Sequence, residues 1–129
     1  MRYPDGYLNG LRLFNAREFW ECHEELEDIW LKLDGEPRLF YQGLIQMAAA
    51  FHHVYHTGRW PAACRLFEQS REKLASYRPR YMGLNVDEIV ERLELCRAAA
   101  AGVNSGVQLP EEADGSMVFE VWPADGPSA

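Results

Sequence analysis

The stretch Asn15-Ala-Arg-Glu-Phe-Trp-Glu-Cys-His-Glu-Glu-Leu-Glu-Asp-Ile-Trp30 decides the fold, because it places ionisable side chains within an apolar helix face. On a helical wheel at about 100° per residue, apolar side chains flank a stripe that contains His23 and Glu27. The flanking residues are Phe19, Leu26 and Trp30 on one side and Trp20 and Leu31 on the other. The opposite side is rich in carboxylates, as is typical of a solvated face. The pattern predicts an amphipathic helix with a polar pair on its inner side.

Composition limits the classes of function. The chain has 129 residues, of which 47% are hydrophobic, enough for one domain with a buried core. The net charge of −7 argues against binding to nucleic acid or to anionic membrane surfaces. No stretch approaches the roughly 20 apolar residues of a membrane helix, and the N-terminus shows no signal-like apolar block. We therefore expect a cytoplasmic protein with no nucleic-acid or membrane partner.

The cysteines are few and widely spaced. Cys22, Cys64 and Cys96 form no C-x-x-C pair, so neither a disulfide framework nor a cysteine zinc site is indicated. We expect reduced, mostly buried thiols.

Local signals mark where the first helices begin. Asp5 is a candidate N-cap for the first helix. Asn15 and Glu18 predict a capping box for the second helix. Phe14 is expected to pack on Phe19 as a hydrophobic staple, which fixes the angle at which the chain enters that helix.

The next segment is predicted to be the central helix. It runs from about residue 38 to residue 57 and is apolar on nearly every side, which indicates neighbours all round. Gly35 can end the preceding helix, and Pro37 suits the first turn of this one. Polar and small residues share one side of the central helix, where a second backbone can approach. They are Gln42, Gln46 and His53, beside Gly43, Ala49 and Ala50.

Two further helices and a tail complete the predicted fold. Pro61 opens one helix, and Asn85 with Glu88 predicts the cap of another that runs to about residue 101. We expect an all-α, compact bundle of about five helices over residues 1–102. Residues 103–129 are expected to form a short extended or partly disordered tail. Its alternating stretch at 116–122 can lie along the helical body, pair with a second copy or be loose.

The candidate site starts from the spacing of His23 and Glu27. Residues four apart on a helix lie on one face, close enough to hydrogen-bond or to bind one metal. The flanking apolar residues imply burial, which is costly for a carboxylate unless it is paired or coordinated. We therefore expect a polar pocket between this helix and the central one. Its expected members are His23, Glu27, Gln42, Gln46 and His53, with Glu24 at its edge.

Two classes of function stay open. In the first, a small-molecule ligand or substrate binds among these groups and the two tryptophans, Trp20 and Trp30. His23 then acts as metal ligand or general base and Glu27 as its partner or second ligand, for example in metal-dependent hydrolysis. The tentative ligands of a divalent transition metal are His23, Glu27 and His53, although no H-E-x-x-H or E-x-x-H motif is present. In the second, the polar set is structural, within a non-enzymatic interaction module that forms a homodimer.

Other polar residues favour structural roles. His52 lies on another side of the central helix and His56 lies near its end, and both are interpreted as packing or capping residues. Cys22 lies about 100° from His23 on the wheel, which argues against a shared site. The cluster of Tyr77, Arg78, Arg80 and Tyr81 is interpreted as a solvated connection rather than an anion site.

His23-x-x-x-Glu27-x-x-Trp30, followed by Gln42-Gly-Leu-Ile-Gln-Met-Ala48, resembles the bacterial and archaeal family named domain of unknown function 309. The resemblance is strongest over residues 11–53 and extends through residue 95. It implies a compact all-helical fold, cytoplasmic residence, and functional positions at His23, Glu27 and Trp30. Cys22 stands where the resemblance leads us to expect a small residue such as alanine. The resemblance implies no particular reaction.

Overall fold

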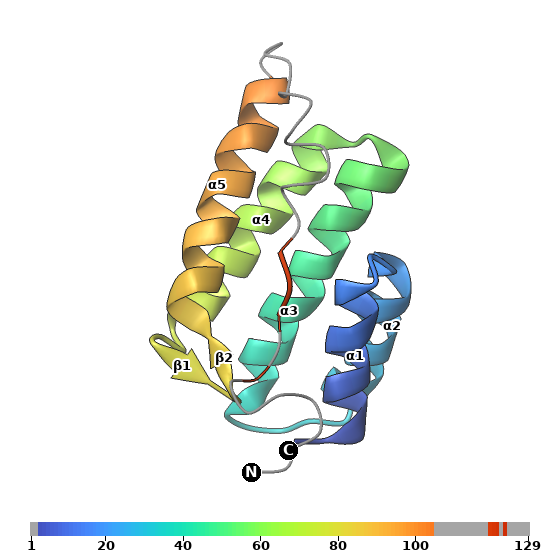
Figure 1. Ribbon diagram of the computed structural model, residues 1–129, viewed down its shortest axis with the longest axis vertical. Coiled ribbons are helices and arrows are strands. Elements are labelled where there is room, and N and C mark those ends of the chain that lie inside the picture. Colours follow the sequence, from blue (N-terminus) through green and yellow to red (C-terminus); the bar gives the residue numbers. More distant parts are fainter. Residues whose placement is uncertain (1–2, 105–118, 122, 124–129) are drawn as a thin grey trace.

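The computed structural model describes residues 3–104, 119–121 and 123. Figure 1 shows the elements in these residues. They are α1 (Asp5–Asn15), α2 (Phe19–Trp30), α3 (Pro37–His52), the π-helix η1 (His53–Thr57), α4 (Trp60–Ala75), β1 (Arg80–Tyr81), β2 (Leu84–Asn85) and α5 (Val86–Asn104). The predicted all-α fold class is confirmed. No helix of the described residues is both long enough and apolar enough to cross a membrane.

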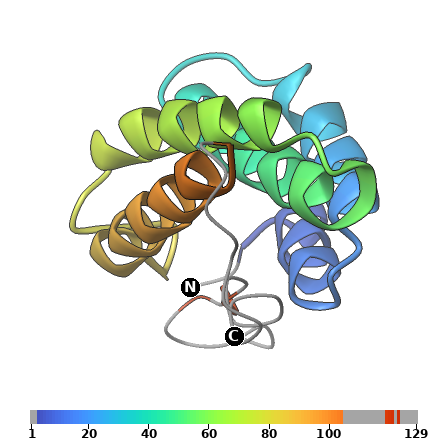
Figure 2. The ribbon, with the colours of Figure 1, turned by 90° about the horizontal axis from the view of Figure 1, so that it is seen from above.

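Helix α3 lies at the centre of the bundle. It packs against α2 on one side and α4 on the other, while α1 packs on α2 and α5 on α4. Figure 2 shows α3, α4 and α5 beside one another, with the α1–α2 hairpin next to α3. Aromatic rings join these layers, since Phe51 of α3 lies 5.4 Å from Phe19 and 5.0 Å from Phe67 between ring centroids. The nearly all-round apolar character of α3 therefore follows from its many neighbours.

The starts of α1 and α2 confirm one local prediction and contradict two. The rings of Phe14 and Phe19 lie 5.4 Å apart, as the hydrophobic staple predicted. The predicted capping box is wrong, because Glu18 occupies the N-cap and makes no side-chain cap hydrogen bond. Asn15 is the last residue of α1, and its side chain hydrogen-bonds to Val121 instead. The N-cap of α1 is Pro4, so Asp5 is the first helical residue and the prediction of an Asp5 cap is also wrong.

Close approach of α3 and α4 depends on Gly43. The Ser70 hydroxyl donates a hydrogen bond to the Gly43 carbonyl at 2.7 Å, and both residues are buried. A Cβ atom at position 43 would lie 2.8 Å from Cδ2 of Leu74. The prediction that a small residue here admits a neighbouring backbone is thus confirmed. The α-helical part of the central helix ends at His52, and the π-helix continues it to Thr57.

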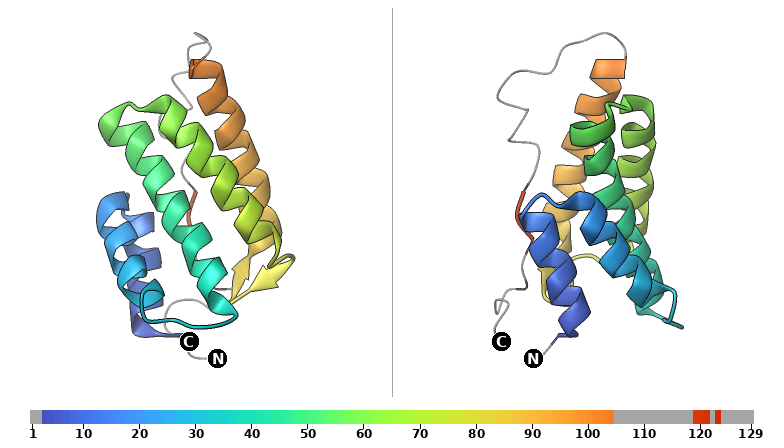
Figure 3. Two further views of the ribbon diagram at one scale, coloured as in Figure 1. Left: turned by 180° about the vertical axis from the view of Figure 1, so that it is seen from behind. Right: turned by 90° about the vertical axis from the view of Figure 1, so that its right-hand side faces the viewer.

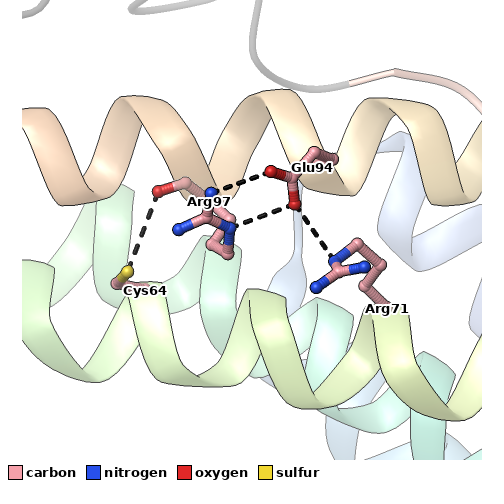
Figure 4. Close-up of polar contacts among 4 residues, drawn as sticks. All are labelled: Cys64, Arg71, Glu94 and Arg97. Atoms are coloured by element: carbon pink, nitrogen blue, oxygen red, sulfur yellow. Dashed lines mark hydrogen bonds and ion pairs between the residues drawn. The ribbon is translucent and has the colours of Figure 1, made fainter.

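The α4–α5 pair is linked by a short hairpin and a polar cluster. Strands β1 and β2 pair antiparallel where a simple connection was predicted. The predicted Asn85 cap is confirmed, since the Glu88 amide donates to Asn85 Oδ1 at 3.1 Å. In Figure 4 the Glu94 carboxylate accepts hydrogen bonds from Arg97 at 2.8 and 3.0 Å and pairs with Arg71 at 3.1 Å.

Residues Phe119–Val121 lie against the helical body, which is one of the three arrangements expected for the tail. Figure 3 shows this segment beside α1, although the two are far apart in the sequence. Val121 is buried, and the ring of Phe119 lies 6.0 Å from that of Phe14. Residues 116–118 and 122 of the same predicted stretch lie outside the described residues. The division into a domain and a tail at residue 102 stays a prediction, and helix α5 runs to Asn104.

Candidate functional site

Helix α2 presents its predicted polar pair at the margin of the core. The side chains that α2 buries are Phe19, Cys22 and Leu26, at a spacing of three and four residues. His23 Nε2 lies 3.6 Å from Glu27 Oε2, and their side chains are 17% and 45% exposed, respectively. The two residues are therefore neighbours, as the spacing predicted. The expected burial of Glu27 is wrong, because the face that packs against α3 is centred on Phe19, Cys22 and Leu26.

The residues predicted on α3 do not complete a pocket with this pair. Gln46 donates a hydrogen bond to Gln69 of α4 at 3.3 Å. His53 Nδ1 lies 2.8 Å from the Thr57 hydroxyl within η1. Gln42 is half-buried, and Glu24 on α2 is exposed. The expected five-residue pocket is therefore not assembled, because Gln46 and His53 find their partners on α4 and in η1.

The tentative metal ligands are not gathered either. Within residues 3–104, 119–121 and 123, no group of three or more His, Cys, Asp and Glu side chains could hold a metal ion. His23, Glu27 and His53 thus do not form a donor set. The chemistry available here is that of a mostly buried imidazole beside a half-exposed carboxylate.

Trp20 forms the centre of a different cluster. Its indole is 44% exposed and stacks on the His23 ring, with centroids 4.6 Å apart and planes 8° from parallel. The His52 ring lies 5.0 Å from the Trp20 ring, and the His56 ring lies 5.2 Å from that of His52. The structure thus brings together Trp20 and His23, which were predicted as site residues, with two histidines that were interpreted as packing or capping residues.

An open groove of about 480 Å³ runs beside this cluster. Its lining residues are Arg17, Glu18, Trp20, Glu21, His52 and His56. Burial lowers the pKa of His52, and the neighbouring His56 and His53 lower it further, so its imidazole is uncharged at neutral pH. The Nδ1 atoms of His23 and His52 are buried and have no hydrogen-bond partner in the described part of the chain. The groove is therefore aromatic, with carboxylates and a guanidinium at its edge.

The local backbone at this groove is also unusual. Helix α3 ends at His52, and the π-helix η1 (His53–Thr57) follows directly. Single π-helical turns within helices are rare and occur frequently at functional sites. Arg17, which precedes α2, has a φ of 65°, in the left-handed region. The groove is thus built where two helices start or end rather than on regular helix faces.

Trp30, the last of the predicted site residues, lies at the other end of α2. The Arg38 guanidinium lies over the Trp30 ring at 4.0 Å from its centroid. Arg38 Nε also donates to the Leu33 carbonyl at 3.2 Å. These contacts tie the end of α2 to the start of α3 through a cation–π interaction. Trp30 therefore has a clear structural role, and it does not line the groove.

Part of the chain is similar to a known protein family. Residues 7–66 match the family model described as "Domain of unknown function (DUF309)". The chain is therefore similar to the DUF309 family over these residues, which make up just under half of its length. The DUF309 match covers α1 from Tyr7 onward, all of α2, α3 and η1, and the beginning of α4. Every residue that lines the groove lies within it.

Two uncharacterised proteins are similar to parts of the chain. YpuF of Bacillus subtilis (strain 168) is 40% identical over 53 residues, which cover 40% of this chain and 30% of that protein. An uncharacterised protein of Aquifex aeolicus (strain VF5) is 30% identical over 82 residues, which cover 63% of this chain and 24% of that protein. The aligned segments thus make up less than a third of either relative. No solved structure matches the chain.

Proposed function

We propose that this protein is a binding domain and that the groove beside Trp20 holds its ligand. The single observation that supports this proposal is the half-exposed Trp20 indole, which stacks on His23 and lines the groove with His52. Large aromatic side chains usually bury much of their surface, and a ligand that stacks on the ring would cover it. The volume of about 480 Å³ lies within the range of about 300–1,000 Å³ that is typical of small-molecule sites.

The chemistry of the groove favours a small molecule with a flat, apolar part. Such a part can stack on the indole of Trp20. Glu18 and Glu21 can accept hydrogen bonds from donors at the edge of the ligand, and an uncharged His52 can donate or accept one. The ligand proposed here therefore combines an aromatic ring with one or more N–H or O–H donors.

Catalysis has less support from the geometry. Metal-dependent hydrolysis requires a donor set with an open position, and the described His, Cys, Asp and Glu residues form no such set. His23 Nε2 and Glu27 Oε2 lie 3.6 Å apart, but neither residue lines the groove. Binding without a chemical step is the function that requires the fewest further groups. Homodimer formation stays a separate prediction, to be checked by sedimentation.

The test is a screen of a fragment library by saturation-transfer difference NMR. The library contains single-ring aromatic fragments with N–H or O–H donors and, as a comparison, aliphatic fragments of similar size. We expect aromatic fragments to bind the wild-type chain and to lose at least tenfold in affinity on Trp20→Ala. A matched control is Leu95→Ala, which truncates another exposed apolar side chain, 67% exposed, on α5.

The interpretation of the screen depends on Trp20 and on the fold. Circular dichroism must show that Trp20→Ala keeps its helix content, which we expect because the indole is only partly buried. Fragments that bind wild type and both variants equally would contradict the proposal. So would the absence of any aromatic fragment that binds wild type below about 1 mM, which corresponds to about 4 kcal/mol of binding free energy.

A further inference from the structure

Residues 119–121 and 123, called the C-terminal segment below, lie on the helical body in the manner of a bound peptide. We propose that the surface beneath it is a recognition groove for an extended peptide of a partner protein. The C-terminal segment is then its built-in occupant. In Figure 1 the described part of this segment passes in front of α3, between α1 and α5. This surface is separate from the groove beside Trp20, so the two proposals do not depend on each other.

One side-chain carboxamide, that of Asn15, binds both the backbone N–H and the backbone C=O of Val121. The Val121 amide donates to Asn15 Oδ1 at 2.8 Å, and Asn15 Nδ2 donates to the Val121 carbonyl at 3.1 Å. A neighbouring β-strand offers a residue the same pair of bonds. Asn15 therefore binds the main chain of Val121 and not its side chain, as in peptide recognition by strand addition.

Alternate side chains of the segment face the helical body. The ring of Phe119 lies 6.0 Å from the rings of both Phe14 and Phe51. Val121 is 3% exposed, and Pro123 is also buried. Residues two apart on an extended chain point to the same side, which agrees with the contacts of Phe119 and the burial of Val121 and Pro123. The pattern that the groove recognises is therefore aromatic–x–branched aliphatic–x–proline.

The end of the groove is shaped for the proline. A Cβ atom at Gly83 would lie 2.6 Å from Cβ of Pro123 and 2.5 Å from the Tyr3 hydroxyl oxygen. Gly83 has a φ of 80°, which is also favourable for glycine. The hairpin of β1 and β2 thus leaves room for a ring at this position. A cavity of about 60 Å³ stays beside the segment, lined in part by Phe119, Ile89 and Glu88.

The position of the segment in the chain indicates that it is separable from the groove. Asn15 and Val121 are 106 positions apart, and residues 105–118 connect the segment to α5. Phe14, Asn15 and Phe51 lie within the match to the DUF309 family, which ends at residue 66. The family-matched part of the chain therefore supplies the backbone clamp and the aromatic contacts, while the occupant lies outside it. A segment of a partner protein with the same pattern can make the same contacts.

The test compares binding of a free peptide to full-length chains with the segment in place and released. The probe is a fluorescein-labelled peptide with the sequence of residues 117–123, Met-Val-Phe-Glu-Val-Trp-Pro, measured by fluorescence anisotropy. Val121→Asp releases the segment, because it puts a carboxylate at a buried position. A tethered segment competes at an effective concentration of about 1 mM. We therefore expect the Val121→Asp chain to bind the peptide at least tenfold more tightly than wild type does.

Two controls assign the binding to the groove. Adding Asn15→Ala to the Val121→Asp chain should weaken peptide binding at least tenfold, because both main-chain bonds are lost. A peptide with aspartate at the position of Val121 should not bind the released chain. Phe119→Ser provides a second way to release the segment, and circular dichroism checks that each variant keeps its helices.

Several outcomes would overturn the proposal. One is a released chain that does not bind the peptide, or that binds it equally well with and without Asn15. A second is unfolding of both Val121→Asp and Phe119→Ser, which would make the segment part of the core. A third is a wild-type dimer in sedimentation that Val121→Asp dissociates, since the occupant would then be the segment of a second copy.

Discussion

Substitution of Gly43 by alanine tests how closely α3 and α4 approach. The added Cβ atom would lie 2.8 Å from Cδ2 and 2.9 Å from Cγ of Leu74, and 3.4 Å from Cβ of Lys73. Leu74 is fully buried, so its side chain has little room to move away. Either the helices separate or Leu74 adopts a strained rotamer. Separation would also lengthen the 2.7 Å hydrogen bond from Ser70 to the Gly43 carbonyl.

The expected change in the free energy of unfolding is the balance of favourable and unfavourable contributions. Alanine is favoured over glycine in a helix by about 1 kcal/mol. Overpacking of a buried contact costs about 1–3 kcal/mol, and a weakened buried hydrogen bond costs up to about 1 kcal/mol. We therefore expect Gly43→Ala to lower the free energy of unfolding by about 1–2 kcal/mol. In the absence of the close contact with Leu74, the same substitution would raise it by about 1 kcal/mol.

Urea denaturation followed by circular dichroism measures this difference. A double-mutant cycle with Leu74→Ala assigns the effect to the contact. Leu74→Ala alone should cost about 2–5 kcal/mol, and the extra methyl group of Gly43→Ala should then fit the space it leaves. The double variant should be more stable than the sum of the single effects predicts, by about 1 kcal/mol or more. Stabilisation by Gly43→Ala alone, or strict additivity of the two changes, would refute the reasoning.

Three further predictions concern titratable groups. The pKa of His52 is lowered from 6.5, so the unfolded chain binds the proton more readily, and this residue lowers stability as pH falls through about 6.5. Between pH 7.5 and 5.0 the melting temperature should fall more for wild type than for His52→Gln, and equal falls would contradict this. The arginines beside Glu94 lower its pKa from 4.5, so its stabilising effect is present above that pH and is lost on further acidification. Because its side chain is 47% exposed, Glu94→Gln should cost less than about 1 kcal/mol in urea titrations at pH 7, and less at pH 3 than at pH 7. Burial raises the pKa of both Cys22 and Cys96 to about 12, so an aromatic disulfide reagent should modify the half-buried Cys64 first. Equal rates of modification at the three thiols, measured by mass spectrometry of peptides, would be inconsistent with this burial.

The helices could be predicted from the sequence because their signals are local. The Phe14–Phe19 staple and the Asn85 cap involve residues within five positions of each other, and both are present. The capping box at Asn15 failed for the opposite reason. Its carboxamide binds the main chain of Val121, 106 positions away, and no local rule weighs such a partner. A side chain that fits a cap is thus also suited to other backbone groups.

The candidate site was predicted only in part, because the sequence does not orient the central helix. His23 and Glu27 are neighbours through spacing alone, and that prediction is confirmed. Which side of α3 faces α2 could not be read from a segment that is apolar nearly all round. The available signal was that His52 shares a wheel position with Tyr41 and Ala48, both of which are buried. On this signal, His52 was as good a candidate for a site residue as His53.

The sides of α3 explain why adjacent residues serve unrelated purposes. One residue along a helix turns the side chain by about 100°, so Phe51, His52 and His53 point in three directions. Phe51 contacts Phe119 and belongs to the peptide surface, while His52 lies beside Trp20 and lines the proposed ligand groove. His53 bonds within η1. Because one rigid helix carries both surfaces, substitutions in α3 that shift it as a whole should disturb both, whereas Trp20 and Asn15 allow each surface to be tested alone.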